Sequence, residues 1–187
     1  MTWIQTYTGK QFDFNDPEAP IELEDIQNAL GNLCRFVGHT RKFYSVAEHS
    51  IYVMTTAIEE GMRRGRSASE VWDIGRWGLL HDASEAYLGD VSRPLKHRDG
   101  FEEYRAMEAR LLSRIADRFK LSPEMPEEVR WADGSMLRVE ADELLAPREH
   151  GWPFLPEPPL NPPKISALGP SEAISSFKGL CRIWDIV

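Results

Sequence analysis

Residues 71–90 read VWDIGRWGLLHDASEAYLGD, and this stretch is the best guide to how the chain folds. It is apolar enough to form a central, largely buried helix. Ser67 followed by Glu70 matches the capping-box pattern, which predicts that the helix begins near Ala68. Gly89 is a suitable C-terminal stop. The pattern therefore predicts one long helix from about Ala68 to about Gly89.

Three residues that lie close together in this stretch are candidates for metal binding and catalysis. His81 and Asp82 are adjacent, and Glu85 follows His81 by one turn, so we expect all three to approach one cavity from a single helix. This arrangement places a pair of metal ligands beside a group able to transfer a proton. A His-Asp pair alone also fits a buried histidine with a purely structural carboxylate partner. The surrounding sequence has to decide between these interpretations.

The rest of the chain is predicted to be mainly helical. Apolar residues at near-helical spacing predict helices over 21–36, 46–58 and 101–119. Ser122 and Pro123 supply an N-cap and a first-turn proline for a further helix containing EEVRWADGSMLRVEADELL. The MRRGR charge cluster after the second helix is interpreted as a solvated loop.

The two ends of the chain have a different character. Residues 1–20 alternate Thr with aromatic residues and are expected to form a small hairpin or an extended arm. Residues 147–170 begin with PREHGWPFLPEPPLNPP, which is too rich in proline for a helix and is expected to form a surface loop. A last helix is expected within 171–187. The prediction is an all-α helical bundle, with a single domain over 1–187.

Composition excludes several classes of protein. The formal net charge of −8 argues against a general nucleic-acid binder, which needs a basic surface. The two cysteines, Cys34 and Cys181, lack CxxC spacing, so they are interpreted as buried thiols rather than zinc ligands or a disulfide framework. The N-terminus lacks the pattern of a signal peptide, and no stretch is apolar enough to span a membrane. A cytoplasmic location without membrane partners is expected.

Three segments of the chain together carry a resemblance to a known family. RFVGHTRKFYSVAEHS (35–50), LLHDASEAYLGDVSRPLK (79–96) and VRWADGSMLRVE (129–140) closely resemble the HD-domain 5′-deoxynucleotidase family and its phage-associated relatives. The resemblance runs from about Ile4 to Glu140. It implies an HD-domain helical bundle, and relatives of this kind are usually homo-oligomers.

The resemblance also implies a site for one divalent metal ion. The family order His, His-Asp, Asp transfers to His49, His81, Asp82 and Asp133. Two imidazoles and two carboxylates make a mixed nitrogen and oxygen site that leaves positions for water and a substrate phosphate, and it suits Mn, Co, Zn, Fe or Mg. For Asp133 an alternative stays open, because Asp142 lies nearby on the same predicted helix.

Four further residues match functional positions of the family. Glu85 is expected to activate the attacking water or protonate the leaving oxygen, with Asp90 as a second catalytic carboxylate. Asp90 follows a glycine, so it is also a suitable turn or cap residue. Arg35 and Lys96 are expected to bind the substrate phosphate, Arg35 by paired hydrogen bonds and Lys96 as a point charge. For either cation the alternative is a solvated surface residue.

Three more residues are assigned to substrate binding with an open alternative. His39 matches the phage-associated members, but it would equally suit a backbone hydrogen bond at a helix break. Phe36 and Pro94 are candidates for packing a nucleobase, although core packing explains a single Phe equally well.

The resemblance implies a metal-dependent phosphohydrolase acting on a nucleotide substrate. The first expectation is a 5′-deoxynucleotidase, which hydrolyses a deoxynucleoside monophosphate to deoxynucleoside and phosphate. The alternative is a triphosphohydrolase of the dATP type that releases triphosphate. A third possibility, from another class, is a catalytically silent HD module that only binds a nucleotide. That module would require an eroded site, whereas the sequence carries the complete set.

Overall fold

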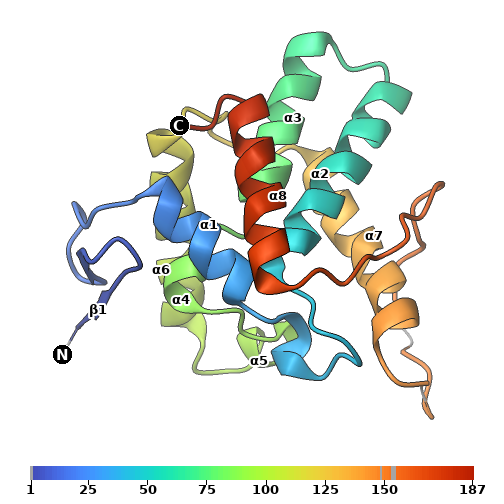
Figure 1. Ribbon diagram of the computed structural model, residues 1–187, viewed down its shortest axis with the longest axis horizontal. Coiled ribbons are helices and arrows are strands. Elements are labelled where there is room, and N and C mark those ends of the chain that lie inside the picture. The colour runs from blue at the N-terminus through green and yellow to red at the C-terminus, as the bar shows by residue number, and fades with distance from the viewer. Residues whose placement is uncertain (1, 148, 153–154) are drawn as a thin grey trace.

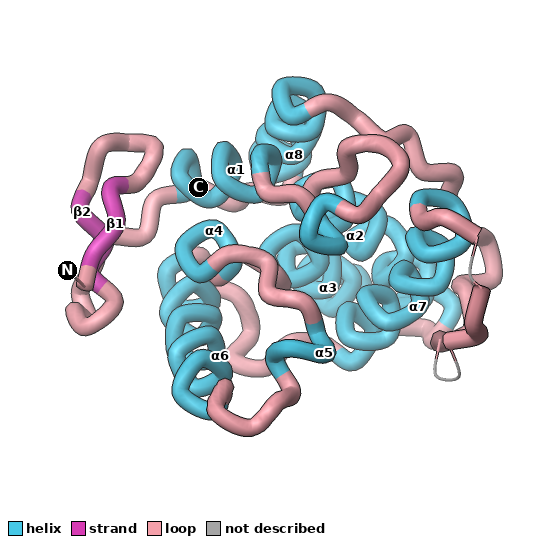
Figure 2. The backbone as a smooth tube through the Cα atoms, turned by 90° about the horizontal axis from the view of Figure 1, so that it is seen from below, coloured by secondary structure: helices cyan, strands magenta, loops and turns pink. Residues whose placement is uncertain are grey.

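The computed structural model describes residues 2–147, 149–152 and 155–187, and it is mainly helical (Figures 1 and 2). This confirms the all-α class with a short N-terminal hairpin. None of the helices among the described residues combines the length and the apolar character needed to cross a bilayer. The elements in chain order are β1 (Trp3–Gln5), β2 (Gln11–Asp13), α1 (Leu23–Asn32), the 3₁₀ helix η1 (Arg35–Gly38), α2 (Val46–Arg63), α3 (Ala68–Leu80), α4 (Glu85–Leu88), α5 (Arg93–Lys96), α6 (Glu102–Arg118), α7 (Glu127–Leu144) and α8 (Pro170–Ile183).

The helix α2 occupies the centre of the bundle. It packs most extensively on α3 and α7, and it also contacts α1 and α8, so α8 and α7 flank it from the C-terminal half of the chain (Figure 1). The buried side chains of these helices form one apolar cluster, which includes Ile26, Leu30, Val53, Leu79, Met136 and Phe177. The centre of the fold is thus built from helices that lie far apart in sequence.

Gly78 is the point of closest approach between α2 and α3. A Cβ atom at this position would lie 2.5 Å from the Cα atom of Met54 on α2, far inside van der Waals contact. Only glycine therefore lets the two backbones meet at this distance. The contact holds the end of α3 close to α2.

The N-terminal hairpin is fastened to the bundle by one aromatic stack and one aspartate. Ile4 pairs with Phe12 across the antiparallel strands, and the Phe12 ring stacks on Tyr87 of α4 with 4.2 Å between centroids. Asp25 of α1 accepts a hydrogen bond from the Thr8 backbone N–H at 2.7 Å. Of the two forms expected, arm or hairpin, the residues form the hairpin.

The segment before α8 returns to the start of α2 without regular structure. The described residues of 145–169 form no helix or strand, as the proline content predicts. The backbone N–H groups of Ala167 and Leu168 donate to the buried Glu48 carboxylate at 2.9 and 2.8 Å. Glu48 therefore pins this return segment beside the first turn of α2.

The prediction of one long helix from Ala68 to Gly89 is wrong for the second half of this range. α3 ends at Leu80, residues 81–84 form a turn, and the short helix α4 follows before Gly89, whose φ of +80° ends it. In the turn, Ala83 N donates to Leu80 O at 3.0 Å, so the hydrogen bond spans three residues rather than four. The predicted start, including the capping box, is confirmed.

Two other helix boundaries differ from the predictions for local reasons. The first helix ends at Asn32 rather than near Phe36, because the Leu33 carbonyl accepts from Val46 N at 3.0 Å instead of continuing a helix. The helix expected from Ser122 begins only at Glu127. The helical conformation is unfavourable for a residue that precedes proline. Met125 precedes Pro126, so the helix starts only after this proline.

The MRRGR segment is exposed, as expected of a solvated segment, but its first residues belong to α2. α2 continues past Ile58 to Arg63, and the Arg63 and Arg64 guanidinium groups both contact the Glu60 carboxylate at 2.6 Å. These hydrogen bonds, partly offset by desolvation, lower the pKa of Glu60 to about 2.

Of the cysteines expected to be buried thiols, Cys181 is buried and Cys34 only half-buried, and both are free.

Candidate metal centre and substrate site

The first turn of α2 presents His49 to the centre of the bundle. The Ser45 side chain caps the helix by accepting from Glu48 N at 3.1 Å. His49 is fully buried, and its Nδ1 lies 2.5 Å from Oε1 of Glu140 on α7. A carboxylate only accepts, so Nδ1 carries the proton and Nε2 faces the other way.

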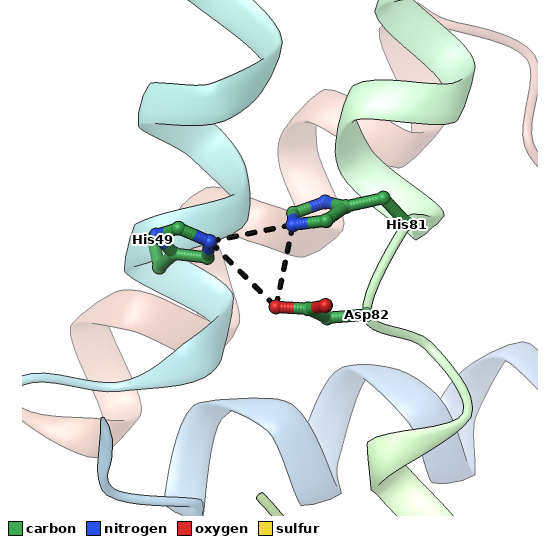
Figure 3. A group of neighbouring side chains, drawn as sticks. All are labelled: His49, His81 and Asp82. Atoms are coloured by element: carbon green, nitrogen blue, oxygen red, sulfur yellow. Dashed lines mark hydrogen bonds and ion pairs between the residues drawn. The ribbon is translucent and has the colours of Figure 1, made fainter. Parts of the chain in front are cut away.

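The break after α3 positions His81 and Asp82. His81 is buried at the C-terminus of α3, and its Nδ1 donates to the Gly78 carbonyl at 2.9 Å. A carbonyl can only accept, so the proton is on Nδ1. In this tautomer of the neutral ring, Nε2 carries no proton. Asp82 lies in the turn, off the helix, and its carboxylate points toward the two imidazoles (Figure 3).

Three donor atoms converge between α2 and the end of α3 (Figure 3). The Nε2 atoms of His49 and His81 are 3.3 Å apart, and Oδ2 of Asp82 lies 3.6 and 3.3 Å from them. Because each Nδ1 atom contacts a separate acceptor, both Nε2 atoms are available as ligands beside one carboxylate oxygen. A cation at this point would satisfy all three donors, and the nitrogen and oxygen set fits a divalent transition metal.

Asp133 reaches the same group from α7. Its Oδ1 lies 3.3 Å from the His49 Nε2. Asp142, the alternative on this helix, has a 43% exposed side chain paired with Arg138 at 2.7 Å. The structure thus groups three of the four predicted ligands and places Asp133, rather than Asp142, next to one of them, His49.

Glu85 lies at the edge of this group as the first residue of α4. The side chain is buried, Oε1 accepts from the Lys96 Nζ at 3.3 Å, and Oε2 is buried without a hydrogen-bond partner among the described residues. Burial, together with the charges of Asp82 and Asp90, raises the pKa of Glu85 well above its ordinary value. A carboxyl group of this kind retains its proton more readily than a free glutamic acid.

Arg35 borders the group on the side of η1. One terminal nitrogen lies 3.5 Å from Oδ2 of Asp82, and the other donates to Oε2 of Glu140 at 3.2 Å. Its Nε is buried without a partner among the described residues. The guanidinium is therefore a largely enclosed cation beside the candidate metal ligands, and not the solvated surface residue that the sequence left open.

Lys96 and Asp90 complete the border. The Lys96 Nζ contacts Glu108 of α6 at 2.6 Å as well as Glu85, and these carboxylates raise its pKa despite partial burial. Asp90 is half-buried after Gly89, and burial is the main reason that its pKa is raised. Lys96 is thus held at the site, whereas Asp90 makes no described side-chain contact to it.

The three residues assigned to the base or sugar have different positions. Phe36 is half-buried, with the Arg35 guanidinium 5.7 Å from its ring centroid. Its φ of +54° is uncommon for a non-glycine residue and marks a strained turn. His39 and Pro94 are exposed, and among the described residues neither side chain has a recorded contact with the metal ligands.

Sequence reasoning missed Glu140 and Tyr44. Glu140 is fully buried on α7 and contacts His49 and Arg35, while the Tyr44 hydroxyl donates to its Oε1 at 2.9 Å. One signal was available, because Glu140 follows Asp133 by two helical turns and so shares its face. It lies at the end of the VRWADGSMLRVE segment that carried the resemblance.

Comparison with known proteins places the chain in a family. No family model matches it. The chain is 33% identical to the uncharacterized protein YfdR of Escherichia coli over 156 residues, which cover 83% of this chain and 79% of YfdR. The chain belongs to the YfdR family. An uncharacterized protein of Rhodobacter capsulatus is 34% identical over 149 residues, 76% of this chain and 72% of that protein.

The fold is that of a solved HD-domain protein. The cyanophage S-2L HD phosphohydrolase DatZ, whose structure contains dA and one catalytic Zn²⁺ ion, matches with a TM-score of 0.56 over 88% of this chain and 83% of DatZ. Sequence identity is 16%, so the match establishes the HD-domain fold. It agrees with the fold that the sequence resemblance implies for this member of the YfdR family.

Proposed function

We propose that the chain is a metal-dependent phosphohydrolase that converts deoxynucleoside 5′-monophosphates to deoxynucleoside and phosphate. One observation carries the proposal: two imidazole nitrogens and an aspartate oxygen converge, with an arginine whose side chain is 13% exposed beside the aspartate and a buried glutamic acid nearby. The HD fold shared with DatZ, a phosphohydrolase whose structure contains dA and one catalytic Zn²⁺ ion, supports it. A silent binding module would not require this full set.

One divalent cation would be held by His49, His81, Asp82 and Asp133. When bound, such a cation polarises a phosphoryl oxygen and makes a water molecule more acidic. Two imidazoles favour Zn, Fe, Co or Mn over Mg, which prefers oxygen ligands. DatZ contains Zn²⁺, and we propose a transition metal here too.

The chain's own residues would bind the phosphate and move the proton. Arg35 offers N–H groups next to Asp82, and Lys96 offers its ammonium group next to Glu85. The oxygen of water forms a bond to phosphorus, the bond from phosphorus to the 5′-oxygen breaks, and the 5′-oxygen takes up a proton. Glu85 is placed to handle this proton, because it is buried and has one free oxygen.

Charge at the site favours a monophosphate over a triphosphate. Arg35 and Lys96 already contact carboxylates, which include Asp82, Glu85, Glu108 and Glu140. A triphosphate would add several negative charges next to these carboxylates. Among the described residues, no lysine or arginine other than Arg35 and Lys96 forms an ion pair with them. The triphosphohydrolase alternative is therefore the second candidate, and the test below separates the two.

The test is a panel of nucleotides with metal-loaded protein. We expect free phosphate from deoxynucleoside monophosphates with Mn²⁺ or Co²⁺, and none after chelation, because the ligands alone do not activate water at neutral pH. Resolving phosphate, pyrophosphate and triphosphate identifies the bond that is cleaved. Triphosphate as the main product would favour the second candidate, and full activity in excess EDTA after verified metal removal would exclude both.

A further inference from the structure

Glu140 lies behind the metal ligands and uses both carboxylate oxygens on neighbouring side chains. We propose that Glu140 is a positioning residue that sets both His49 and Arg35, so that one carboxylate organises the metal-binding and the phosphate-binding half of the site. The inference rests on the function proposed above. It concerns a residue outside the set of ligands and catalytic groups.

Both carboxylate oxygens of Glu140 are taken up by contacts with neighbouring side chains, so Glu140 does not act on the substrate directly. Oε1 accepts from the Tyr44 hydroxyl at 2.9 Å and from His49 Nδ1 at 2.5 Å, and Oε2 accepts from Arg35 at 3.2 Å. The side chain has no exposed surface. A carboxylate so enclosed reaches neither substrate nor water, and it acts through the groups that it holds.

The first consequence concerns His49. Donation from Nδ1 to Glu140 fixes the tautomer in which Nε2 carries the lone pair, and it prevents rotation of the ring. A carboxylate behind an imidazole also makes that imidazole a better metal ligand. Without Glu140, the fully buried His49 ring would lose both its orientation and its partner.

The second consequence concerns Arg35. Its two terminal nitrogens span Glu140 and Asp82, so the guanidinium plane is fixed between a buried carboxylate and a proposed metal ligand. If Glu140 were neutral, Asp82 would be the one carboxylate left within ion-pair distance of Arg35 among the described residues. Arg35 would then compete with the cation for Asp82. Loss of Glu140 charge is expected to weaken metal binding by this route as well.

The decisive variant is Glu140→Gln, which keeps the size of the side chain. One oxygen can still accept, but the amide NH₂ cannot accept from Arg35. Glu143→Gln is the matched control, because Glu143 lies one turn later on α7 and accepts from Ile165 N at 3.2 Å, outside the cluster. Tyr44→Phe removes a single hydrogen bond from the same carboxylate and leaves its charge.

Metal affinity is measured by titration with Co²⁺, followed by visible absorption, which needs no turnover. We expect Glu140→Gln to weaken Co²⁺ binding by about 10–100-fold, the usual effect of removing a partner behind a metal ligand. Glu143→Gln should bind as wild type does, and Tyr44→Phe should fall between. Wild-type affinity in folded Glu140→Gln would overturn the proposal. If that variant does not fold, Glu140→Asp, which keeps the charge but retracts it, decides by the same titration.

Steady-state kinetics at saturating Co²⁺ test the Arg35 half. We expect Glu140→Gln to raise the KM for a deoxynucleoside monophosphate even when every site holds metal, whereas a merely structural role would lower only the thermal stability. An unchanged KM would overturn that half. If wild type binds no Co²⁺, the proposed function fails. If wild type binds Co²⁺ and Glu140→Gln loses it, positioning holds even where no nucleotide is hydrolysed.

Discussion

At His49 and His81, the proton on Nδ1 already has a partner, Glu140 for one and the Gly78 carbonyl for the other. Both Nε2 atoms are therefore committed to one point in the interior. Asp82 and Asp133 supply the negative charge that two imidazoles cannot. The roles proposed for these four residues follow from where their hydrogens and charges lie, and Glu85 stands apart because its second oxygen has no hydrogen-bond partner among the described residues.

That difference leads to a prediction for Glu85. Glu85→Gln should retain the metal, because Glu85 is not among the converging donors, and should lose on the order of 10²–10⁴-fold in kcat, as expected of a general acid or base. His81→Ala and Asp82→Ala should instead lose the metal itself. Metal content per chain, measured beside turnover, distinguishes the two cases. Wild-type turnover in Glu85→Gln would remove the residue from the mechanism.

At this scale the sequence identified four candidate ligands but not the residues that support them. His49, His81, Asp82 and Asp133 could be named because their order along the chain matches a known family. Glu140 and Tyr44 could not, because their importance lies in contacts that cross from α7 to α2 and to the segment before it. Hydrogen bonds between distant segments leave no local pattern in a sequence.

At the scale of elements, the break between α3 and α4 is the main difference between the predicted and the observed helices. The letters HDASEA contain no glycine or proline, so local propensity predicts that the helix continues. One tertiary and one local contact accompany the break: Gly78 brings α3 against α2, and the Gly78 carbonyl accepts from the His81 side chain. The turn that results moves Asp82 off the helix and toward His49. The site thus depends on how closely two helices meet.

This dependence predicts the effect of Gly78→Ala. The added methyl group would overlap the Met54 backbone of α2, which cannot move aside as a side chain can, so we expect a destabilisation of about 1–3 kcal/mol. Because α3 would shift from α2, Co²⁺ affinity should fall as well. Urea unfolding and cobalt titration measure the two effects.

Gly179→Ala in α8 is the matched control for that prediction. A Cβ atom there would meet nothing within 4 Å, so the greater helix propensity of alanine should stabilise the protein by about 0.5–1 kcal/mol. Metal affinity should stay as in wild type. Equal effects of the two substitutions would mean that the contact between α2 and α3 does not control the site.

At the scale of the whole molecule, the candidate metal centre joins three parts of the chain. The donors come from α2, from the end of α3 and from α7, and α2 is the element on which the others pack. The all-α class and most of these helices could be predicted from hydrophobic spacing. Their arrangement around α2 came with the resemblance and the structure, since spacing does not specify which helices meet. The expected homo-oligomer stays a prediction, which light scattering can test.

A cation that joins these three segments should stabilise the entire fold. A ligand bound only by the native state at 100 times its Kd contributes about 2.7 kcal/mol. For a chain of 187 residues, each kcal/mol raises Tm by about 2–4 °C. We therefore expect Co²⁺ or Mn²⁺ to raise the Tm of metal-stripped protein by about 5–10 °C, as measured by calorimetry. His81→Ala, which lacks one donor but keeps α2 and α7, should show little of this shift. A large shift in His81→Ala would place the stabilising cation elsewhere, and no shift in wild type that holds one metal per chain would mean that the metal binds without joining the three segments.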